Sequence, residues 1–205
     1  MQHAIRCCGS TMKYQHNIQG ERIALGPVPR DHQDLYRRWF NDFRVQRTAG
    51  LVSLPWNGDN FERFFTNRIL MAEDAAWFTV YENETSKPIG FSGFRDIDHR
   101  HRTAEFFVTI GEGDARGKGY GTEATILTLD YAFTALGLHN VMLDVLSASL
   151  AGIRAYEKAG FRQIGRRREC EMMGGRLWDM VFMECLSSEF ESPVLKDVFK
   201  PDVPR

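Results

Sequence analysis

The chain has 205 residues, of which 43% are hydrophobic and 26% are charged, and its formal net charge at pH 7 is −1. This length and composition are typical of one globular domain with a sizeable core and ragged ends. The near-zero net charge argues against general binding to nucleic acid or to a membrane surface, so neither partner is expected. We assign residues 1–20 to a flexible N-terminal extension, 21–186 to the folded domain and 187–205 to a C-terminal tail.

The cysteines indicate a reducing compartment. Cys7 and Cys8 are adjacent, which suits no disulfide framework, and Cys170 and Cys185 show no paired metal-ligand spacing. The first twenty residues lack the apolar core of a secretory signal, and no apolar run is long enough to span a bilayer. We therefore expect a cytoplasmic protein without a bound metal.

The first half of the domain alternates between strand-like and helix-like patterns. Apolar residues recur at intervals of three and four in the expected helices, whereas the expected strands are short runs bounded by turn residues. In chain order we expect a strand at 21–27, a helix at 31–41, a loop at 49–58, a helix at 59–70, a hairpin of 76–82 with 88–95, and a strand at 103–110.

The second half begins with a glycine-rich loop and ends in a hairpin. We expect the loop at 112–121, a helix at 122–136, a buried strand at 140–146, a helix at 150–158, and strands at 161–172 and 176–186 joined through Gly174-Gly175. Ser149 is the expected N-cap of the helix at 150–158. The tail beyond Leu186 predicts an extended arm, and a homodimer is expected if its apolar residues dock on a neighbouring subunit.

The glycine-rich loop has the pattern of a phosphate site. Gly117, Gly119 and Gly121 let the backbone approach an anion, and the N–H groups that open the next helix attract negative charge. Arg116 and Lys118 add positive charge. The glycine spacing fits neither a Walker loop, in which Ser or Thr follows the lysine, nor the dinucleotide fingerprint Gly-x-Gly-x-x-Gly. Nucleotide binding is therefore a weaker interpretation of this loop.

Two motifs resemble those of the GCN5-related N-acetyltransferases (GNAT). The first is Arg-x-x-Gly-x-Gly at residues 116–121, which is similar to the family's acyl-CoA pyrophosphate loop. The second is the helix of residues 149–161, which carries Tyr156 and ends in Gly160-Phe161. The resemblance covers residues 22–186, and the run from Arg116 to Ala124 is similar to the branch of ribosomal-protein N-terminal acetyltransferases and spermidine acetyltransferases.

The resemblance implies an α/β (α+β) fold of the GNAT type. Its central sheet is mixed and mostly antiparallel, with about six to seven strands flanked by about four helices. The family usually has Asn at the position of Ser149. A pantetheine contact that an amide makes in relatives would therefore have to come from a hydroxyl group here.

The resemblance also implies roles for particular residues. The backbone at Val108 and Ile110 would pair with pantetheine, with Ser149 nearby. The N–H groups from Gly117 to Thr122, which include those of Lys118, Gly119, Tyr120 and Gly121, would hold the pyrophosphate, assisted by the side chains of Arg116 and Lys118. Tyr156 would be the general acid, because a phenol can protonate a departing thiolate. Glu105 is the preferred general base, while Asp96, Asp98 and His99 in the preceding turn stay open as alternatives.

The expected reaction is acetyl transfer from acetyl-CoA to a primary amine by direct attack in a ternary complex. The amine is a protein N-terminus or a small molecule. The alternative is an acyl-CoA-binding sensor or interaction module that keeps the fold without turnover. Residues 51–60 and 96–102 are expected to shape the acceptor pocket, and their apolar content favours a peptide or small amphipathic amine over a naked polyamine.

Overall fold

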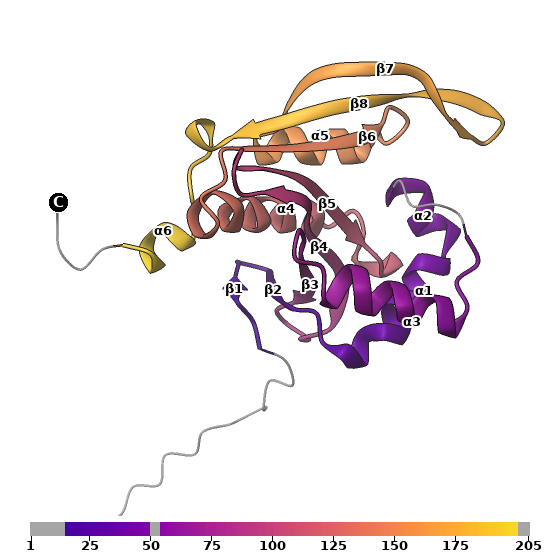
Figure 1. Cartoon of the computed structure of the whole chain (residues 1–205), viewed down its shortest axis with the longest axis horizontal. Helices are drawn as coiled ribbons and strands as arrows, with labels where there is room; N and C mark the ends of the chain where they lie inside the picture. Colours follow the sequence, from indigo (N-terminus) through magenta and orange to yellow (C-terminus); the bar gives the residue numbers. More distant parts are fainter. Residues whose placement is uncertain (1–14, 50–53, 201–205) are drawn as a thin grey trace, which may run out of the picture.

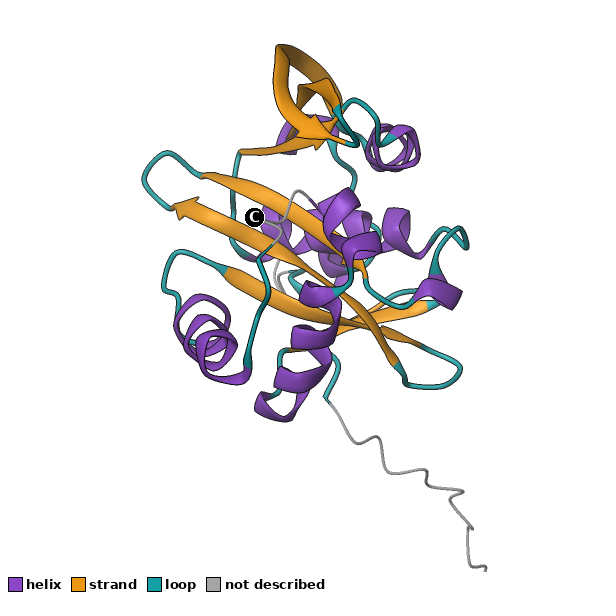
Figure 2. Ribbon diagram, turned by 90° about the vertical axis from the view of Figure 1, so that its right-hand side faces the viewer, coloured by secondary structure: helices purple, strands orange, loops and turns teal. Residues whose placement is uncertain are grey.

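The computed structural model describes residues 15–49 and 54–200, which form one sheet with helices on both of its faces (Figures 1 and 2). The strands are β1 (Ile18–Gln19), β2 (Ile23–Pro27), β3 (Ala76–Glu82), β4 (Pro88–Asp98), β5 (Thr103–Ile110), β6 (Asn140–Leu146), β7 (Arg162–Met173) and β8 (Arg176–Leu186). Their order across the sheet is β1-β2-β3-β4-β5-β6-β8-β7. Every neighbouring pair is antiparallel except β5 and β6, which are parallel.

Six α-helices accompany the sheet in the described residues. They are α1 (Gln33–Asn41), α2 (Phe43–Ala49), α3 (Gly58–Phe64), α4 (Tyr120–Asp130), α5 (Leu150–Ala159) and α6 (Leu195–Val198). Two of them continue into π-helical turns, α3 through Leu70 and α4 through Ala135. In Figure 1 strands β3 to β5 lie between α4 and the group α1 to α3, so these helices cover opposite faces.

Each face of the sheet has its own buried core. On the α4 side, Phe106 of β5 packs with Leu129 of α4 and Val141 of β6. On the other side an aromatic cluster of α1 and α3 includes Trp39, and the neighbouring Trp56 packs against its rings. Trp56 is therefore an anchor for the loop before α3.

The parallel pairing of β5 with β6 is short. It joins residues 103–105 to residues 140–142, although β5 continues to Ile110 and β6 to Leu146. Beyond the pair Glu105 and Met142, β5 keeps its partner β4 and β6 keeps its partner β8. The sheet consequently opens between β5 and β6.

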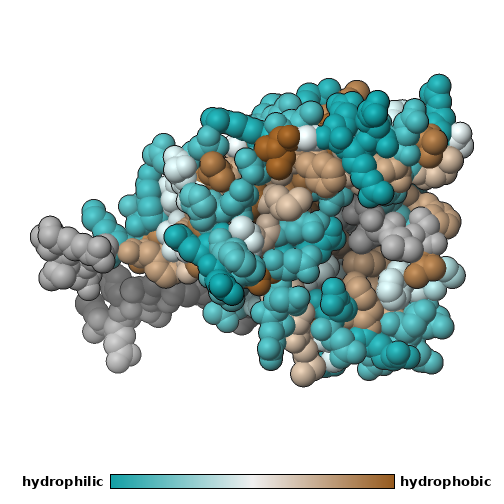
Figure 3. Space-filling view, turned by 45° about the horizontal axis from the view of Figure 1, so that its top comes forward, coloured by the Kyte–Doolittle hydropathy of each residue, from teal (hydrophilic) through white to brown (hydrophobic). Residues whose placement is uncertain are grey.

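The hairpin of β7 and β8 forms as predicted. Gly174 and Gly175 have φ angles of 61° and 73°, and a two-residue type I′ turn requires positive φ at both positions. The outer strand β7 exposes Arg166, Arg167 and Arg168, and charged side chains discourage pairing at a sheet edge. Figure 3, which brings the β7 side forward, shows mostly hydrophilic side chains with scattered apolar ones.

The expected fold class is confirmed, and three details differ from the prediction. Residues 18–19, assigned to the N-terminal extension, pair with β2. Helix α2 was not predicted, because Phe43–Ala49 lacks an apolar repeat and Phe43 is 73% exposed. Helix α4 begins two residues earlier than expected, at Tyr120.

The tail is folded where an extended arm was predicted. Helix α6 follows the expected strand region, and its Leu195 is buried in the core on the α4 side. The carboxylate of Asp130, itself fully buried, accepts hydrogen bonds from the backbone N–H groups of Val194 (3.0 Å) and Leu195 (2.9 Å) and from the hydroxyl of Thr134 (2.9 Å). A side chain distant in sequence therefore accepts hydrogen bonds from the backbone N–H groups at the start of this helix.

Replacing Asp130 is expected to release the C-terminal segment. In Asp130→Ala the N–H groups of Val194 and Leu195 lose their acceptor, which should lower the free energy of unfolding by about 1–3 kcal/mol. Denaturant unfolding measures this loss, and limited proteolysis should cut the variant within residues 187–200 first. Asp197→Ala, which removes an exposed carboxylate from α6, is the control. Equal stability of the two variants would contradict the anchoring role of Asp130.

Candidate active site

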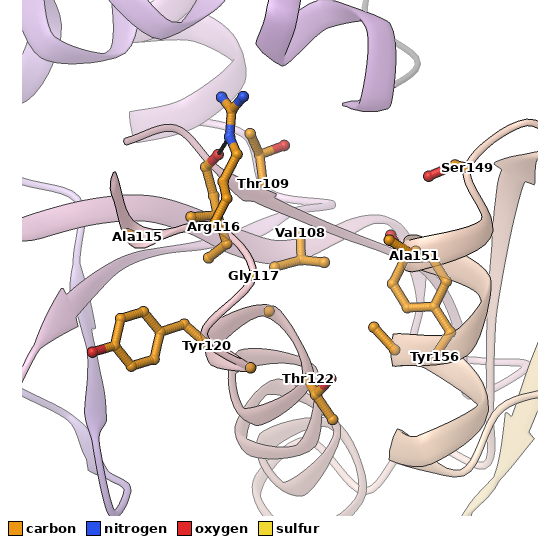
Figure 4. A pocket seen from close by; sticks show the side chains of 15 residues that line it. Val108, Thr109, Ala115, Arg116, Gly117, Tyr120, Thr122, Ser149, Ala151 and Tyr156 are labelled. Atoms are coloured by element: carbon orange, nitrogen blue, oxygen red, sulfur yellow. Dashed lines mark hydrogen bonds between the residues drawn. The ribbon is translucent and has the colours of Figure 1, made fainter. Parts of the chain in front are cut away.

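A cavity of about 310 Å³ lies between the edge of β5, the glycine loop and helix α5. Figure 4 shows α5 on one side of it and the start of α4 on the other. The residues predicted for the site that line it are Val108, Ile110, Arg116, Gly117, Gly119, Tyr120, Gly121, Thr122, Ser149 and Tyr156. Lys118 and Glu105 do not line the cavity.

The glycine loop presents its backbone to the cavity. Gly117 and Gly119 adopt left-handed conformations, with φ of 75° and 85°, which cost a residue with a side chain about 1–2 kcal/mol. Gly119 is the N-cap of α4. The first N–H groups of α4 therefore have no partner within the helix and carry its positive dipole end, which favours a bound anion.

Arg22, the residue immediately before β2, holds this loop in place. Its Nη1 donates to the carbonyl oxygen of Lys118 (2.8 Å), and its Nε forms an ion pair with Glu123 of α4 (3.0 Å). Glu123 also accepts a hydrogen bond from the backbone N–H of Arg22 (2.9 Å). The strand thus fixes the loop relative to the helix that follows it.

The two cationic side chains of the loop make different contacts in the structure. Arg116 donates from Nε to the carbonyl of Ile110 (3.0 Å) and from Nη2 to that of Gly111 (3.1 Å), and Figure 4 shows its guanidinium turned away from α4. Lys118 is exposed, with Nζ 5.9 Å from the ring centroid of Tyr120. Arg116 consequently supports the end of β5, and the anion site depends mainly on backbone groups.

The edge of β5 offers further backbone groups. The N–H of Gly111 donates to Ile89 of β4, whereas the carbonyl of Ile110 points to Arg116 on the opposite side. Because successive residues of a strand direct their N–H and C=O groups to alternate sides, those of Val108 point to the side of Ile110. This is the edge where β6 has separated, so Val108 can pair with an extended ligand.

Tyr156 of α5 lies at the opposite wall of the cavity from the glycine loop (Figure 4). Its ring packs edge-on against Phe106 and Phe161, at centroid distances of 6.2 and 6.1 Å. Burial, and then the negative charge of Asp144, raises the pKa of the phenol to about 12. Tyr156 therefore keeps its proton at neutral pH and can donate it.

Glu105 belongs to a charged cluster with Arg95 and Asp144. Nη2 of Arg95 donates to Oε1 of Glu105 and lies 3.5 Å from Oδ1 of Asp144. Burial disfavours the charged form of Glu105, but hydrogen bonds from Arg95 and Asp144 outweigh this effect and lower its pKa. Burial, together with the hydrogen bond and negative charge of Glu105, raises the pKa of Asp144 to about 6. Of the two carboxyl groups, Asp144 is therefore the one that holds its proton to the higher pH.

The carboxyl pair and Tyr156 approach the opening of the sheet from opposite faces. Phe106 of β5 and Leu143 of β6 are buried in the core on the α4 side, against which Tyr156 packs. Since side chains alternate along a strand, Glu105 and Asp144 project to the other face. Glu105 is the last residue of β5 that pairs with β6. Asp144 lies two residues beyond Met142, the last residue of β6 that pairs with β5. The pair therefore stands where the strands separate.

The sequence did not identify several residues of the site. Asp144 was seen only as part of a buried strand, and Arg95 as part of a hairpin. Thr109, Ala115, Ala151, Gly152 and Ala155 also line the cavity. The small residues at 151, 152 and 155 recur on the face of α5 that carries Tyr156. This spacing in the sequence could have indicated that this face of the helix lines a cavity. Ser149 lines the cavity, but its side chain makes no capping hydrogen bond to α5.

Other predicted features are described only in part. Residues 51–53, the first part of the loop expected to shape the acceptor pocket, lie outside the described residues, as do Cys7 and Cys8. Cys170 and Cys185 are free thiols. Across 15–49 and 54–200, no three His, Cys, Asp or Glu side chains are arranged to hold a metal ion. No helix in the same ranges has the length and apolar character needed to cross a membrane.

Comparison with known proteins identifies the family. Residues 22–162 match the family described as acetyltransferase (GNAT) domain. An uncharacterized N-acetyltransferase, p20, of Bacillus licheniformis is 30% identical over 173 residues, which are 83% of this chain and 96% of that protein. A spermidine N(1)-acetyltransferase of Vibrio cholerae is 30% identical over 132 residues, or 64% of this chain and 75% of that protein.

A solved structure shares the fold. The crystal structure of spermidine N-acetyltransferase from Vibrio cholerae in complex with CoA and spermine aligns with a TM-score of 0.74 and 24% identity, covering 83% of this chain and 98% of that chain. The chain therefore belongs to the GNAT acetyltransferases. It is an N-acetyltransferase that transfers an acetyl group to an amine, with acetyl-CoA as cosubstrate.

Adding a methyl group at Gly119 is expected to weaken acetyl-CoA binding. Gly119→Ala must adopt φ near 85° and would bring its Cβ to 3.1 Å from Nη2 of Arg22, so the loop should shift. The left-handed strain predicts a rise of about tenfold in the dissociation constant, measured by titration calorimetry with CoA. The control is Gly113→Ala in the same loop, where the added Cβ meets nothing within 4 Å. Equal affinities of the two variants would contradict this account of the loop.

Proposed function

We propose that the chain acetylates a small-molecule primary amine by direct attack on acetyl-CoA, which lies in the cavity between the β5 edge, α4 and α5. One observation carries the proposal: the cavity runs along the edge of β5 from which β6 has separated, and the carboxyl pair stands at the point of separation. Acetyl-CoA would enter from the α5 side and the amine from the α2 side. The spermidine acetyltransferase relatives support a small-molecule acceptor.

The cavity suits the cosubstrate in both shape and polarity. The N–H groups at the start of α4 would hold the pyrophosphate, and the left-handed glycines keep side chains out of its way. The backbone of Val108 would hydrogen-bond the pantetheine as an added strand. The small side chains of Ala151, Gly152 and Ala155 leave room along α5.

The proposed chemistry needs one group that accepts a proton and one group that donates a proton. Acetyl-CoA supplies an acetyl group activated as a thioester. The Glu105–Asp144 pair would accept a proton from the ammonium group of the acceptor, directly or through water, and the neutral amine that results would attack the thioester carbonyl; Asp144 can accept the proton above its pKa of about 6. Tyr156 would donate its proton to the departing thiolate from the other face of the sheet. The base we favoured from sequence, Glu105, thereby acts through Asp144, and Arg95 orients both.

We also propose a cytoplasmic location. The free thiols of Cys170 and Cys185 support it, since a reducing compartment maintains unpaired cysteines.

Acetyl transfer to amines tests the function directly. With acetyl-CoA and a panel of spermidine, short peptides, aminoglycosides and amino acids, mass spectrometry should detect an acetylated product. Tyr156→Phe should lower kcat about 100-fold because the thiolate loses its proton donor. Tyr131→Phe, which removes a hydroxyl outside the cavity, is the control. Tight acetyl-CoA binding without any product would favour the non-catalytic alternative, and unchanged turnover of Tyr156→Phe would refute its role as acid.

The carboxyl pair predicts a pH dependence. Below about pH 6 Asp144 is protonated and cannot accept a proton, so kcat/KM for the amine should fall as the pH drops through this value. Asp144→Asn should lose this acidic limb and about 100-fold of kcat/KM, whereas the limb set by the amine's own ionisation should stay. Profiles from about pH 5 to about pH 9 at saturating acetyl-CoA measure both effects.

Asp98→Asn is the matched control for this profile. Asp98 is a partly exposed carboxylate at the end of β4, next to the turn before β5, and its pKa is lowered by hydrogen bonds from His101. A loss of the acidic limb in Asp98→Asn, with Asp144→Asn unaffected, would assign the base to that turn.

A further inference from the structure

A second cavity, of about 250 Å³, adjoins the first on the acceptor side. Both are lined by Ser149 and Ala151, so they meet at the start of α5. The second cavity is also lined by Leu146 of β6. Leu146 follows Asp144 by two residues and therefore projects to the same face of the sheet. The cavity lies one step along β6 from the carboxyl pair.

Arg47 of α2 gives this cavity a positive charge. It is the one charged residue lining the cavity within the described ranges, and the rest of the lining there is apolar or uncharged, including Leu150 and Met173. Arg47 is exposed and forms no ion pair with any described residue, whereas Arg44 on the same helix pairs with Asp42 at 3.3 Å. The forked N–H groups of a guanidinium suit a carboxylate, which can accept two of them at once.

The position of the second cavity relative to Asp144 sets the length of the acceptor. Residues two apart on a strand are separated by about 7 Å, so the cavity begins roughly that far from Asp144. Leu146, Leu150 and Met173 would contact the intervening part of a ligand. A naked polyamine would instead bring a second ammonium group toward Arg47, and like charges repel.

We propose that this cavity binds the far end of the acceptor, and that the acceptor carries a carboxylate separated from its amine by an apolar segment. A short peptide with a free C-terminus and an ω-amino acid share this chemistry. The inference rests on the proposed function and adds the class of acceptor. Arg47 is the residue that recognises the carboxylate.

Matched pairs of acceptors test this inference. Leucyl-leucine is compared with leucyl-leucinamide, ω-aminohexanoate with hexylamine, and both pairs with spermidine. The carboxylated member of at least one pair should have a kcat/KM roughly 10- to 100-fold higher, as expected for a charge-assisted hydrogen bond, and the preferred pair distinguishes peptide from ω-amino acid. In Arg47→Gln this ratio should fall toward one through a higher KM for the carboxylated acceptor. Arg44→Gln should keep the wild-type ratio.

The outcomes separate this inference from the proposed function. Equal kcat/KM within both pairs, a preference for spermidine, or a rise in the KM for acetyl-CoA in Arg47→Gln would overturn the assignment of Arg47 while acetyl transfer itself stands. Absence of transfer to every amine, with acetyl-CoA bound, would refute the proposed function and this inference with it.

Discussion

The separation of β5 from β6 is the constraint on which the active site depends. Each strand is fully paired on its other side, β5 with β4 and β6 with β8, so neither can bend to close the gap without losing hydrogen bonds. The opening leaves backbone groups of β5 without a strand partner, and such groups need another one. Arg116 satisfies the carbonyl of Ile110. The groups of Val108 face the same edge, where an extended ligand can take the place of a strand.

The same opening explains why two ionisable groups with different pKa values can act on one reaction centre. Tyr156 reaches it from the core on the α4 side, where burial keeps the phenol protonated. Glu105 and Asp144 reach it from the other face, where hydrogen bonds from Arg95 and Asp144 lower the pKa of Glu105 against the effect of burial, while burial and then Glu105 raise the pKa of Asp144. A phenol whose pKa is about 12 and a carboxyl group whose pKa is about 6 therefore approach the opening from different faces, and at neutral pH the first keeps its proton while the second is mostly ionised.

Local patterns predicted what local geometry determines. The glycine spacing of residues 117–121 predicted a tight loop before α4, and Gly174-Gly175 predicted a hairpin turn, because positive φ is a property of single residues. The role of Asp144 could not be seen in the same way. It depends on Arg95, which is 49 residues away in the sequence. Nor did the sequence reveal that Arg116 would turn to the end of β5, since that direction is set by the path of the folded loop.

The same difference between local and long-range determinants separates the site proposed for acetyl-CoA from the site proposed for the amine. In the proposed function, the cosubstrate side of the opening uses mainly backbone groups and glycines, and its sequence signature is therefore local. The proposed acceptor side uses side chains from α2, β6 and β7, and one of these, Arg47, lies on a helix whose sequence has no apolar repeat. A single substitution there changes the charge that meets the acceptor without disturbing the fold or the cosubstrate. Relatives that share the cosubstrate site can therefore differ in the amine they acetylate, and the charge of the acceptor cavity is a better guide to that amine than overall identity.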